Sequence, residues 1–441
     1  MSFDLVIHGG TVFTPGGPVE TDVGVKDGKI AAIGALAPGR GAQAFDATGL
    51  TVLPGLIDEQ VHFREPGPTH KEDLESGTRG AVLGGIVAVF EMPNTDPATT
   101  TVGTINDKIA RATGRCWTDF AFYVGASPEN AEELATLERL PGCCGVQMFM
   151  GSSTGTLLVA DDENVARVLR SGSRRVTVHS EDDFRLQERA AMVAGGADVS
   201  MHPEWRDVET AVRSTQRLLT LARAHHRRVH VLHVTTAEEM ELLAQHKDIA
   251  TVEVLPQHLT LAAPECYQRL GTLAQMNPPI REARHRDALW KALNDGVVDC
   301  IGSDHAPHTL EEKAKPYPRS PSGLTGVQTT VPVMLNHIAE GRLTLQRLVD
   351  LMSAGPARIF GIAGKGRVAL GYDGDFTVVD MKAKRTITND WIASRTGWTA
   401  FDGMAVTGWP MATIIRGNIV MRDDELLERP IGEAVRFQET L

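Results

Sequence analysis

Eight short runs rich in β-branched and aromatic residues alternate with longer stretches of helical periodicity between about residues 51 and 304. This alternation is typical of a parallel βα protein, because neighbouring parallel strands need a crossover, usually a helix. Eight strands over about 250 residues match a closed TIM-type (β/α)8 barrel, whereas a doubly wound sheet usually uses fewer strands and a glycine-rich first turn. We therefore predict barrel strands at 51–63, 86–94, 119–126, 144–150, 174–180, 228–234, 250–257 and 297–305.

Short alternating strands of another kind flank this region at both ends of the chain. They are punctuated by Gly-Gly, Asp-Gly and Gly-Asn turns, which are hairpin signals. They cannot all be barrel strands, and we predict that they pair into one small β-sandwich of residues 1–50 and 366–441, beside a barrel domain of residues 51–365. Two independent β-hairpins are the alternative. The segments concerned are 3–13, 22–34, 376–382 and 412–421.

Composition and charge narrow the class of partner. The chain carries a net charge of -12 with a pI near 5.7, whereas nucleic-acid binding is driven by clustered Lys and Arg. The sequence shows no apolar run long enough to span a bilayer and no signal-peptide pattern at the N-terminus. We expect a cytoplasmic protein that binds a small molecule, has no nucleic-acid or membrane partner, and forms a homo-oligomer.

Two further patterns concern cofactors and redox state. No GxGxxG or GxxxxGK[ST] motif follows the first predicted strand, so a nucleotide cofactor is not expected. The five cysteines are odd in number and lack a CxxC pair, which favours reduced, buried thiols. The adjacent Cys143 and Cys144 are interpreted as packing residues, with redox activity as the alternative.

Polar residues gather where the predicted barrel strands end, which is where barrels of this kind build their active sites. A single buried histidine is usually a hydrogen-bonded core residue, but here four strand ends carry a histidine or an aspartate. Imidazole nitrogens and a carboxylate suit Zn²⁺ or a similar divalent ion. The predicted ligands are His62, His179, His233 and Asp304. Further polar residues lie on or just after the predicted barrel strands, namely Gln60, Arg64, Asn94, Gln147, His258 and His308.

Strand geometry refines this set. His230 and His233 are three residues apart and point to opposite faces of their strand, so only one of them can face the mouth. His305 adjoins Asp304 and is interpreted as a wall or supporting residue. The Pro- and Gly-bearing segment 313–326 is a candidate for a loop that closes over the mouth.

Seven motifs in chain order resemble dihydroorotases of the amidohydrolase superfamily, and the resemblance covers nearly the whole chain. It implies that Asp304 is the last metal ligand and the general base. It also implies that Arg64 and Asn94 grip a substrate carboxylate, and that Asn277 and His308 make further ring and carboxylate contacts. The motifs are GLIDEQVHFREPG, EMPNT, GVQMFMGSSTG, VTVHSED, VLHVTTAEE, QMNPPIR and GSDHAPHTLEEK.

Two positions depart from the family pattern. The family carries a histidine two residues before His62 and a carboxylated lysine on strand four that bridges two zinc ions. Here Gln60 and Gln147 occupy those positions. A carboxamide cannot form a carbamate and binds Zn²⁺ only weakly through its oxygen. We therefore expect one Zn²⁺ in place of two, and weaker turnover than a two-zinc site gives.

The resemblance leads to three hypotheses. The first is an enzyme that reversibly interconverts dihydroorotate and N-carbamoyl-aspartate in pyrimidine biosynthesis. The second, motivated by the two glutamines, is a non-catalytic scaffold for aspartate carbamoyltransferase. The third is a hydrolase of a hydantoin, dihydropyrimidine or allantoin ring. Arg64 favours a carboxylated ring, because a guanidinium binds a carboxylate with two hydrogen bonds; its alternative role is an ion pair with Glu65 or Glu72.

Overall fold

The computed structural model describes residues 2–37, 39–153, 155–427 and 429–440. Eight parallel strands, paired in chain order, form its central sheet, and a bridge between Val61 and His305 brings the last strand back beside the first. The predicted TIM barrel is thereby confirmed. Its strands are β6 (Leu56–Val61), β7 (Ile86–Glu91), β8 (Asp119–Gly125), β9 (Cys143–Phe149), β10 (Val176–His179), β11 (Val229–Val231), β12 (Ala250–Val254) and β13 (Cys300–Ile301).

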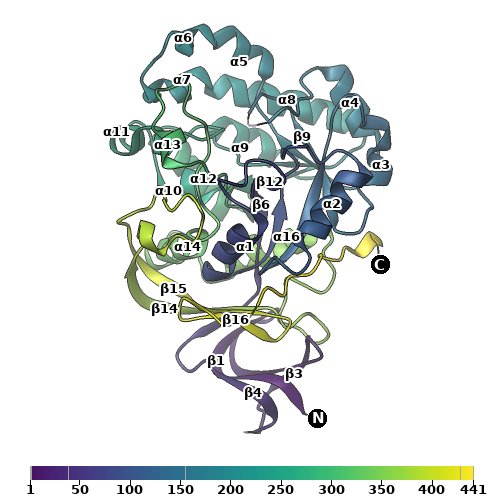
Figure 1. Cartoon of the computed structure of the whole chain (residues 1–441), viewed down its shortest axis with the longest axis vertical. Coiled ribbons are helices and arrows are strands. Elements are labelled where there is room, and N and C mark those ends of the chain that lie inside the picture. The colour runs from purple at the N-terminus through teal and green to yellow at the C-terminus, as the bar shows by residue number, and fades with distance from the viewer. Residues whose placement is uncertain (1, 38, 154, 428, 441) are drawn as a thin grey trace.

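Helices cover the outside of the barrel (Figure 1). Several begin at a side chain that accepts a hydrogen bond from the first turn, as Asp161, Asp207 and Thr236 do, which satisfies an otherwise unpaired backbone donor. Their apolar faces pack on the strands in the largest hydrophobic core of the molecule. The longer helices are α1 (Leu74–Leu83), α2 (Val102–Ala112), α4 (Asp162–Arg170), α5 (Asp183–Arg189), α8 (Val208–Ala224), α9 (Ala237–Ala244), α12 (Ala283–Asn294) and α14 (Thr330–Ala339).

Short helical turns fill the connections between these elements, and several of them lie on the side of the mouth. They are α3 (Leu134–Leu137), α6 (Ala191–Ala194), α7 (His202–Trp205), α10 (Pro256–Thr260), α11 (Glu265–Leu270), α13 (Leu310–Lys313), α15 (Leu345–Val349) and α16 (Gly355–Phe360).

A second sheet of nine strands combines both ends of the chain, as Figure 1 shows in purple and yellow. Its two halves join where Val52 pairs with Val378, and residues from both halves share one hydrophobic core. The composite β domain is thus confirmed, and two independent hairpins are ruled out; the boundaries at residues 50 and 366 stay a prediction. The strands are β1 (Phe3–Thr14), β2 (Gly17–Lys26), β3 (Lys29–Gly34), β4 (Gly41–Asp46), β5 (Thr51–Pro54), β14 (Phe376–Thr386), β15 (Ala405–Ile415), β16 (Asn418–Arg422) and β17 (Glu425–Leu426).

The C-terminal segment covers the end of the barrel opposite the mouth. Ala434 forms a bridge with Phe120 near the start of β8, and Phe437 forms one with Ile362. Val435 and Phe437 share a core cluster with residues of the barrel interior. This end of the barrel is therefore closed by packing, which leaves the mouth as the open end.

Two expectations on thiols and membranes can be compared with the structure. All five cysteines are buried and unpaired, as expected for reduced packing thiols. Within the described ranges, the structure has no helix whose length and apolar character would let it cross a membrane.

Candidate active site

A cavity of about 30 Å³ lies at the C-terminal ends of the barrel strands, and it has room for one or two water-sized groups. A wider, more open cavity of about 590 Å³ adjoins it through the shared lining residues Arg64 and Asn94. Together they form a polar pocket with an entrance. The inner cavity is lined by Gln60, His62, Arg64, Asn94, Gln147, Phe149, Ser153, His179, His233, Asn277, Asp304, Ala306, Ser322 and Gly323.

The four predicted metal ligands approach this cavity as two pairs. His179 Nδ1 lies 3.1 Å from His233 Nε2, and His62 Nε2 lies 3.1 Å from Asp304 Oδ1. The first pair comes from β10 and β11 and the second from β6 and β13, which lie across the barrel from each other. Among the described residues, no three of the four have ligand atoms that all lie within 4.8 Å of one another. Their convergence on one ion therefore stays a prediction.

The atoms that face the cavity fit a divalent cation. His179 Nε2 bonds to Glu181 Oε2 at 2.8 Å, so a neutral His179 directs the lone pair of Nδ1 at His233. Two nitrogen ligands on a tetrahedral zinc lie roughly 3.3 Å apart, given zinc–nitrogen bonds of about 2.0 Å. The oxygens Oε1 of Gln60 and Gln147 are buried and have no hydrogen-bond partner among the residues that the structure describes. The residues present thus offer imidazole nitrogens and carboxamide oxygens to an ion.

Asp304 lies between Gln60 and His62. Its Oδ1 accepts from Gln60 Nε2 at 3.2 Å and contacts His62 Nε2, while His62 Nδ1 lies 2.8 Å from Asn94 Oδ1. Burial alone would raise the pKa of Asp304, but the hydrogen bond and charge of His62, with smaller effects from the other two histidines, lower it below the ordinary value. Asp304 is therefore ionised near neutral pH and can accept a proton.

Glu181 and Arg206 support the histidine pair, and sequence reasoning missed both of them. Arg206 Nε lies 3.0 Å from Glu181 Oε1, and Glu181 in turn orients the ring of His179. A carboxylate that fixes the tautomer of a metal-ligating histidine is a common supporting feature of metal sites. The two-residue spacing of His179 and Glu181 in VTVHSED was the only available signal for this role.

Arg64 is 5% exposed and opens onto both cavities. The alternative ion pairs do not form, because Glu65 pairs with Arg115 and Glu72 pairs with His305. Within the part of the chain that the structure describes, Arg64 has no carboxylate partner; its Nε donates to the carbonyl oxygen of Pro307 at 3.3 Å. Desolvation lowers the pKa of Arg64 to about 10, so it remains a cation.

The remaining predicted substrate contacts differ in position. Asn277 lines the cavity, where its Oδ1 lies 3.0 Å from His202 Nε2. His308 lies behind Arg64: its Nε2 is 3.0 Å from the carbonyl oxygen of Ser322, so this nitrogen donates, and its Nδ1 accepts from Lys71 at 3.1 Å. His308 does not line the inner cavity and lies beside Arg64, with its Nε2 3.3 Å from Arg64 Nη2, so its contact with a substrate stays a prediction.

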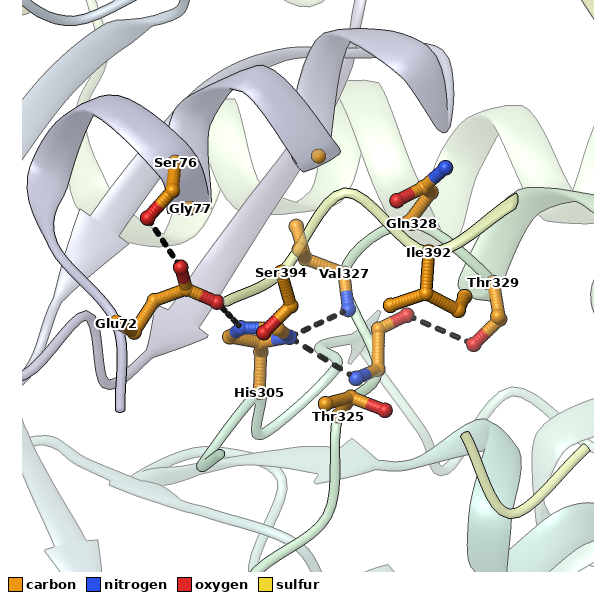
Figure 2. Close-up of a pocket in the computed structure, with 12 residues that line it drawn as sticks. Glu72, Ser76, Gly77, His305, Thr325, Val327, Gln328, Thr329, Ile392 and Ser394 are labelled. Atoms are coloured by element: carbon orange, nitrogen blue, oxygen red, sulfur yellow. Dashed lines mark hydrogen bonds and ion pairs between the residues drawn. The ribbon is translucent and has the colours of Figure 1, made fainter. Parts of the chain in front are cut away.

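His305, which follows Asp304 in the chain, is held by hydrogen bonds to neighbouring segments (Figure 2). Its Nδ1 accepts hydrogen bonds from the backbone N–H groups of Gly326 and Val327, and its Nε2 lies 3.2 Å from Glu72 Oε2. The ring therefore links the segment after β13 to the segment before α14 and to the residues that precede α1. His258 is also held away from the cavity, with its Nε2 3.1 Å from the carbonyl oxygen of Pro278.

Three site residues have a strained backbone. Arg64, His233 and Asp304 adopt φ angles of 63°, 36° and 45°, a left-handed region that non-glycine residues rarely occupy. Such strain persists only where the surroundings enforce it, and it concentrates at functional sites.

His230 and His233 differ in position. His230 lies on β11 in the barrel interior, and of the two only His233, just after β11, lines the cavity.

The predicted loop 313–326 packs at the mouth. Ser322 and Gly323 line the cavity, and the buried Lys313 donates to the carbonyl oxygens of Gln275 and Pro321 at 3.0 and 2.9 Å. At Gly323 a side chain would lie 2.3 Å from the Ala306 carbonyl oxygen, so this close approach requires glycine. The loop thus forms part of the cavity wall.

The amidohydrolase family matches residues 51–420 of the chain. The dihydroorotase of Pyrococcus furiosus is 35% identical over 423 residues, which cover 95% of this chain and 92% of the relative. The L-hydantoinase of Paenarthrobacter aurescens is 32% identical and covers 98% of each chain, and the allantoinase of Escherichia coli is 33% identical over 95% of each.

Solved structures give the same result. The L-hydantoinase (dihydropyrimidinase) from Arthrobacter aurescens superposes with a TM-score of 0.93 at 31% identity, over 98% of this chain and 99% of that one. The matches in sequence, the barrel with its composite β domain, and the polar cavity at the mouth agree with one another. This chain belongs to the amidohydrolase family, among the hydrolases that act on cyclic amides.

Proposed function

We propose that the chain is a dihydroorotase-type enzyme that reversibly opens the dihydroorotate ring to N-carbamoyl-aspartate. The observation that carries this proposal is Arg64, a buried guanidinium that faces the cavities and has no carboxylate partner among the described residues. Burying an unpaired charge is costly, so a site that keeps one is suited to an anionic ligand. Of the rings that the relatives suggest, dihydroorotate carries the matching carboxylate.

The roles of the protein residues follow from their positions. Arg64 binds the ring carboxylate through two hydrogen bonds, and Asn94, on the wall shared by both cavities, adds an amide contact. This pairing directs the ring amide toward Asp304. Asp304 takes a proton from the attacking water and returns it to the ring nitrogen as the carbon–nitrogen bond breaks.

A divalent ion held by His179 and His233, with His62 and Asp304 facing it, would supply Lewis-acid polarisation of the scissile carbonyl. Glu181 and Arg206 keep the ring of His179 in place for that role. Gln60 contributes a hydrogen bond to Asp304 in place of a ligand. We propose one zinc ion, because Gln147 cannot form the bridging carbamate.

Substrate profile and variants of Arg64 test this function together. Zinc-loaded protein is assayed with L-dihydroorotate, with dihydrouracil, which is the same ring without the carboxylate, and with a 5-substituted hydantoin and allantoin. We expect dihydroorotate to be the best substrate. Arg64→Gln should lower kcat/KM for it roughly ten- to a hundredfold, the value of hydrogen bonds to a charged group, without lowering the activity on dihydrouracil.

The control is Arg175→Gln, which changes a half-buried arginine remote from the mouth and should alter neither activity. A preference for hydantoin or allantoin, with Arg64→Gln neutral, would reject the dihydroorotase assignment in favour of another cyclic amide. No turnover of any ring after zinc loading would reject the enzyme and favour the scaffold, whose direct test is binding to aspartate carbamoyltransferase.

A further inference from the structure

A second group of metal-ligand side chains lies inside the barrel, away from the cavity at the mouth. Glu59 on β6, His230 on β11, Glu253 on β12 and Cys300 on β13 each offer one ligand atom, and these four atoms all lie within 4.8 Å of one another. All four residues are completely buried. Among the described residues, this is the only such group of three or more histidine, cysteine and acidic side chains.

Three of the four carboxylate oxygens in this group have no hydrogen-bond partner in the described part of the chain, namely both oxygens of Glu59 and Oε2 of Glu253. Within the described ranges no lysine or arginine pairs with either residue. Two buried carboxyl groups side by side without a cation are unfavourable, because both desolvation and mutual repulsion oppose their charges. A cation bound between the two carboxyl groups would take the place of their protons and compensate both charges.

The other two side chains select the kind of cation. His230 Nδ1 lies 2.8 Å from Thr251 Oγ1, and that hydroxyl donates to the carbonyl oxygen of Val229, so Nδ1 carries the proton. The lone pair of Nε2 then points toward Cys300 Sγ, 3.5 Å away. One imidazole nitrogen and one thiol favour a transition metal such as zinc over magnesium or calcium.

The spacing also suits zinc. Ligand atoms around a tetrahedral zinc lie roughly 3.3 to 3.8 Å apart, given bonds of about 2.0 Å to nitrogen and 2.3 Å to sulfur. The four atoms of the group are within 4.8 Å of one another, so small rotations of the two glutamates are enough to close the set. Thr251, hydrogen-bonded to His230, is the kind of outer partner that fixes a ligating imidazole.

We propose that Glu59, His230, Glu253 and Cys300 bind a structural zinc ion inside the barrel, separate from the ion at the mouth. The ion ties together β6, β11, β12 and β13. Its position also supports the active site, because Glu253 Oε1 accepts the backbone N–H of the strained His233 at 2.9 Å. This proposal does not depend on the substrate or on catalytic activity.

Sulfur coordination separates the two sites, because none of the predicted ligands at the mouth contains sulfur. X-ray absorption at the zinc edge of the full, zinc-loaded chain should show a sulfur neighbour at about 2.3 Å. With cobalt in place of zinc, a thiolate-to-metal charge-transfer band should appear in the near ultraviolet. A wild-type spectrum with nitrogen and oxygen neighbours only, or a chain that takes up no zinc, overturns the proposal.

Variants then assign the sulfur to Cys300. Cys300→Ser should abolish both sulfur signals and lower the zinc content by about one ion per chain. The matched control is Cys144→Ser, another buried thiol of the barrel, which should keep both signals. His179→Asn, which disrupts the mouth, should keep them too. If Cys300→Ser does not fold, Glu59→Gln preserves the side-chain shape and should still lower the zinc content; unchanged zinc in that variant counts against the site.

Discussion

The two ends of the barrel bury charged side chains to a similar extent but treat them differently. At the closed end, Lys365 is 6% exposed and pairs with Asp119, Asp375 and Asp373 at 2.6, 2.5 and 3.2 Å. At the mouth, Arg64 is 5% exposed and has no carboxylate partner in the described part of the chain. Charged side chains are therefore buried at both ends; three carboxylates compensate Lys365, whereas Arg64 has no carboxylate in contact within the described ranges.

The effects on pKa follow this difference. Burial alone would lower the pKa of Lys365, but the three carboxylates outweigh it and raise the pKa above the ordinary value. Burial lowers the pKa of Arg64 to about 10, because the charges of Asp304 and three glutamates raise it by less than burial lowers it. A buried charge that is paired with opposite charges of the protein indicates a structural role. A buried charge without such a pair indicates a site for a charged ligand.

Asp304→Asn gives the largest expected effect on activity. The amide cannot accept the proton of the attacking water, so kcat for dihydroorotate should fall by about 10²–10⁴-fold, the usual value of a general base. The melting temperature should change little, because the amide keeps the size of the carboxyl group. Single-turnover kinetics and thermal unfolding on the same samples check both statements, and a variant that retains most of its kcat would remove Asp304 from the mechanism.

Lys365→Met should show the opposite profile at the closed end. Removing the cation leaves three buried carboxylates close together, and losing one partner of a buried pair costs about 3–5 kcal/mol of unfolding free energy. Activity per folded molecule should stay unchanged, because the mouth lies at the other end of the barrel. Denaturant unfolding and active-site titration measure the two quantities; a stable variant with reduced kcat would invalidate the comparison between the two ends.

The fold was predictable because local patterns carry it. Each predicted barrel strand overlaps an observed one, since a strand buried on both faces is marked by an apolar, β-branched run. The prediction was too long for the last strand, where 297–305 yields only Cys300–Ile301. Asp304 at φ 45° cannot continue a strand, because strand residues have negative φ angles.

The residues that form the site were easier to predict than the way in which their side chains are arranged and paired. Strand ends indicated the residues around the cavity, but the isolation of Arg64 depends on partners that Glu65 and Glu72 find 50 and 233 residues away. No local pattern contains such pairings. The interior group was missed for a related reason, because its four members lie on four different strands that only the closed barrel brings together.

Restoring the family ligands at Gln60 and Gln147 tests whether the mouth can still hold a second metal ion. The double variant Gln60→His and Gln147→Lys, prepared with bicarbonate, should bind about one additional zinc per chain and turn over dihydroorotate faster. The buried, unpartnered oxygens of both glutamines mark the space that the new ligands would use. Gln187→Lys, on α5 outside the cavity, is the control. Unchanged metal content would show that the mouth no longer supports a second ion.

The smallest effect concerns Asp207, a compensated charge that caps α8. Partial burial would raise its pKa, but hydrogen bonds from Arg185 and Thr210 lower it to about 2. Since the folded pKa is below the unfolded value of about 3.9, the stabilisation is complete above pH 4 and disappears as the pH falls toward 2.

Asp207→Asn keeps the helix cap but loses the charge. It should therefore lower the unfolding free energy by about 1 kcal/mol at pH 7, a value discounted for solvent screening of this partly exposed group. The difference from wild type should shrink between pH 4 and pH 3 in urea titrations. Asp248→Asn, in an exposed pair with Arg223, should show no comparable pH dependence. If the difference in unfolding free energy between wild type and Asp207→Asn persists at low pH, Asp207 stabilises the protein only as a helix cap. Charge compensation would then explain stability at the closed end of the barrel but not at Asp207.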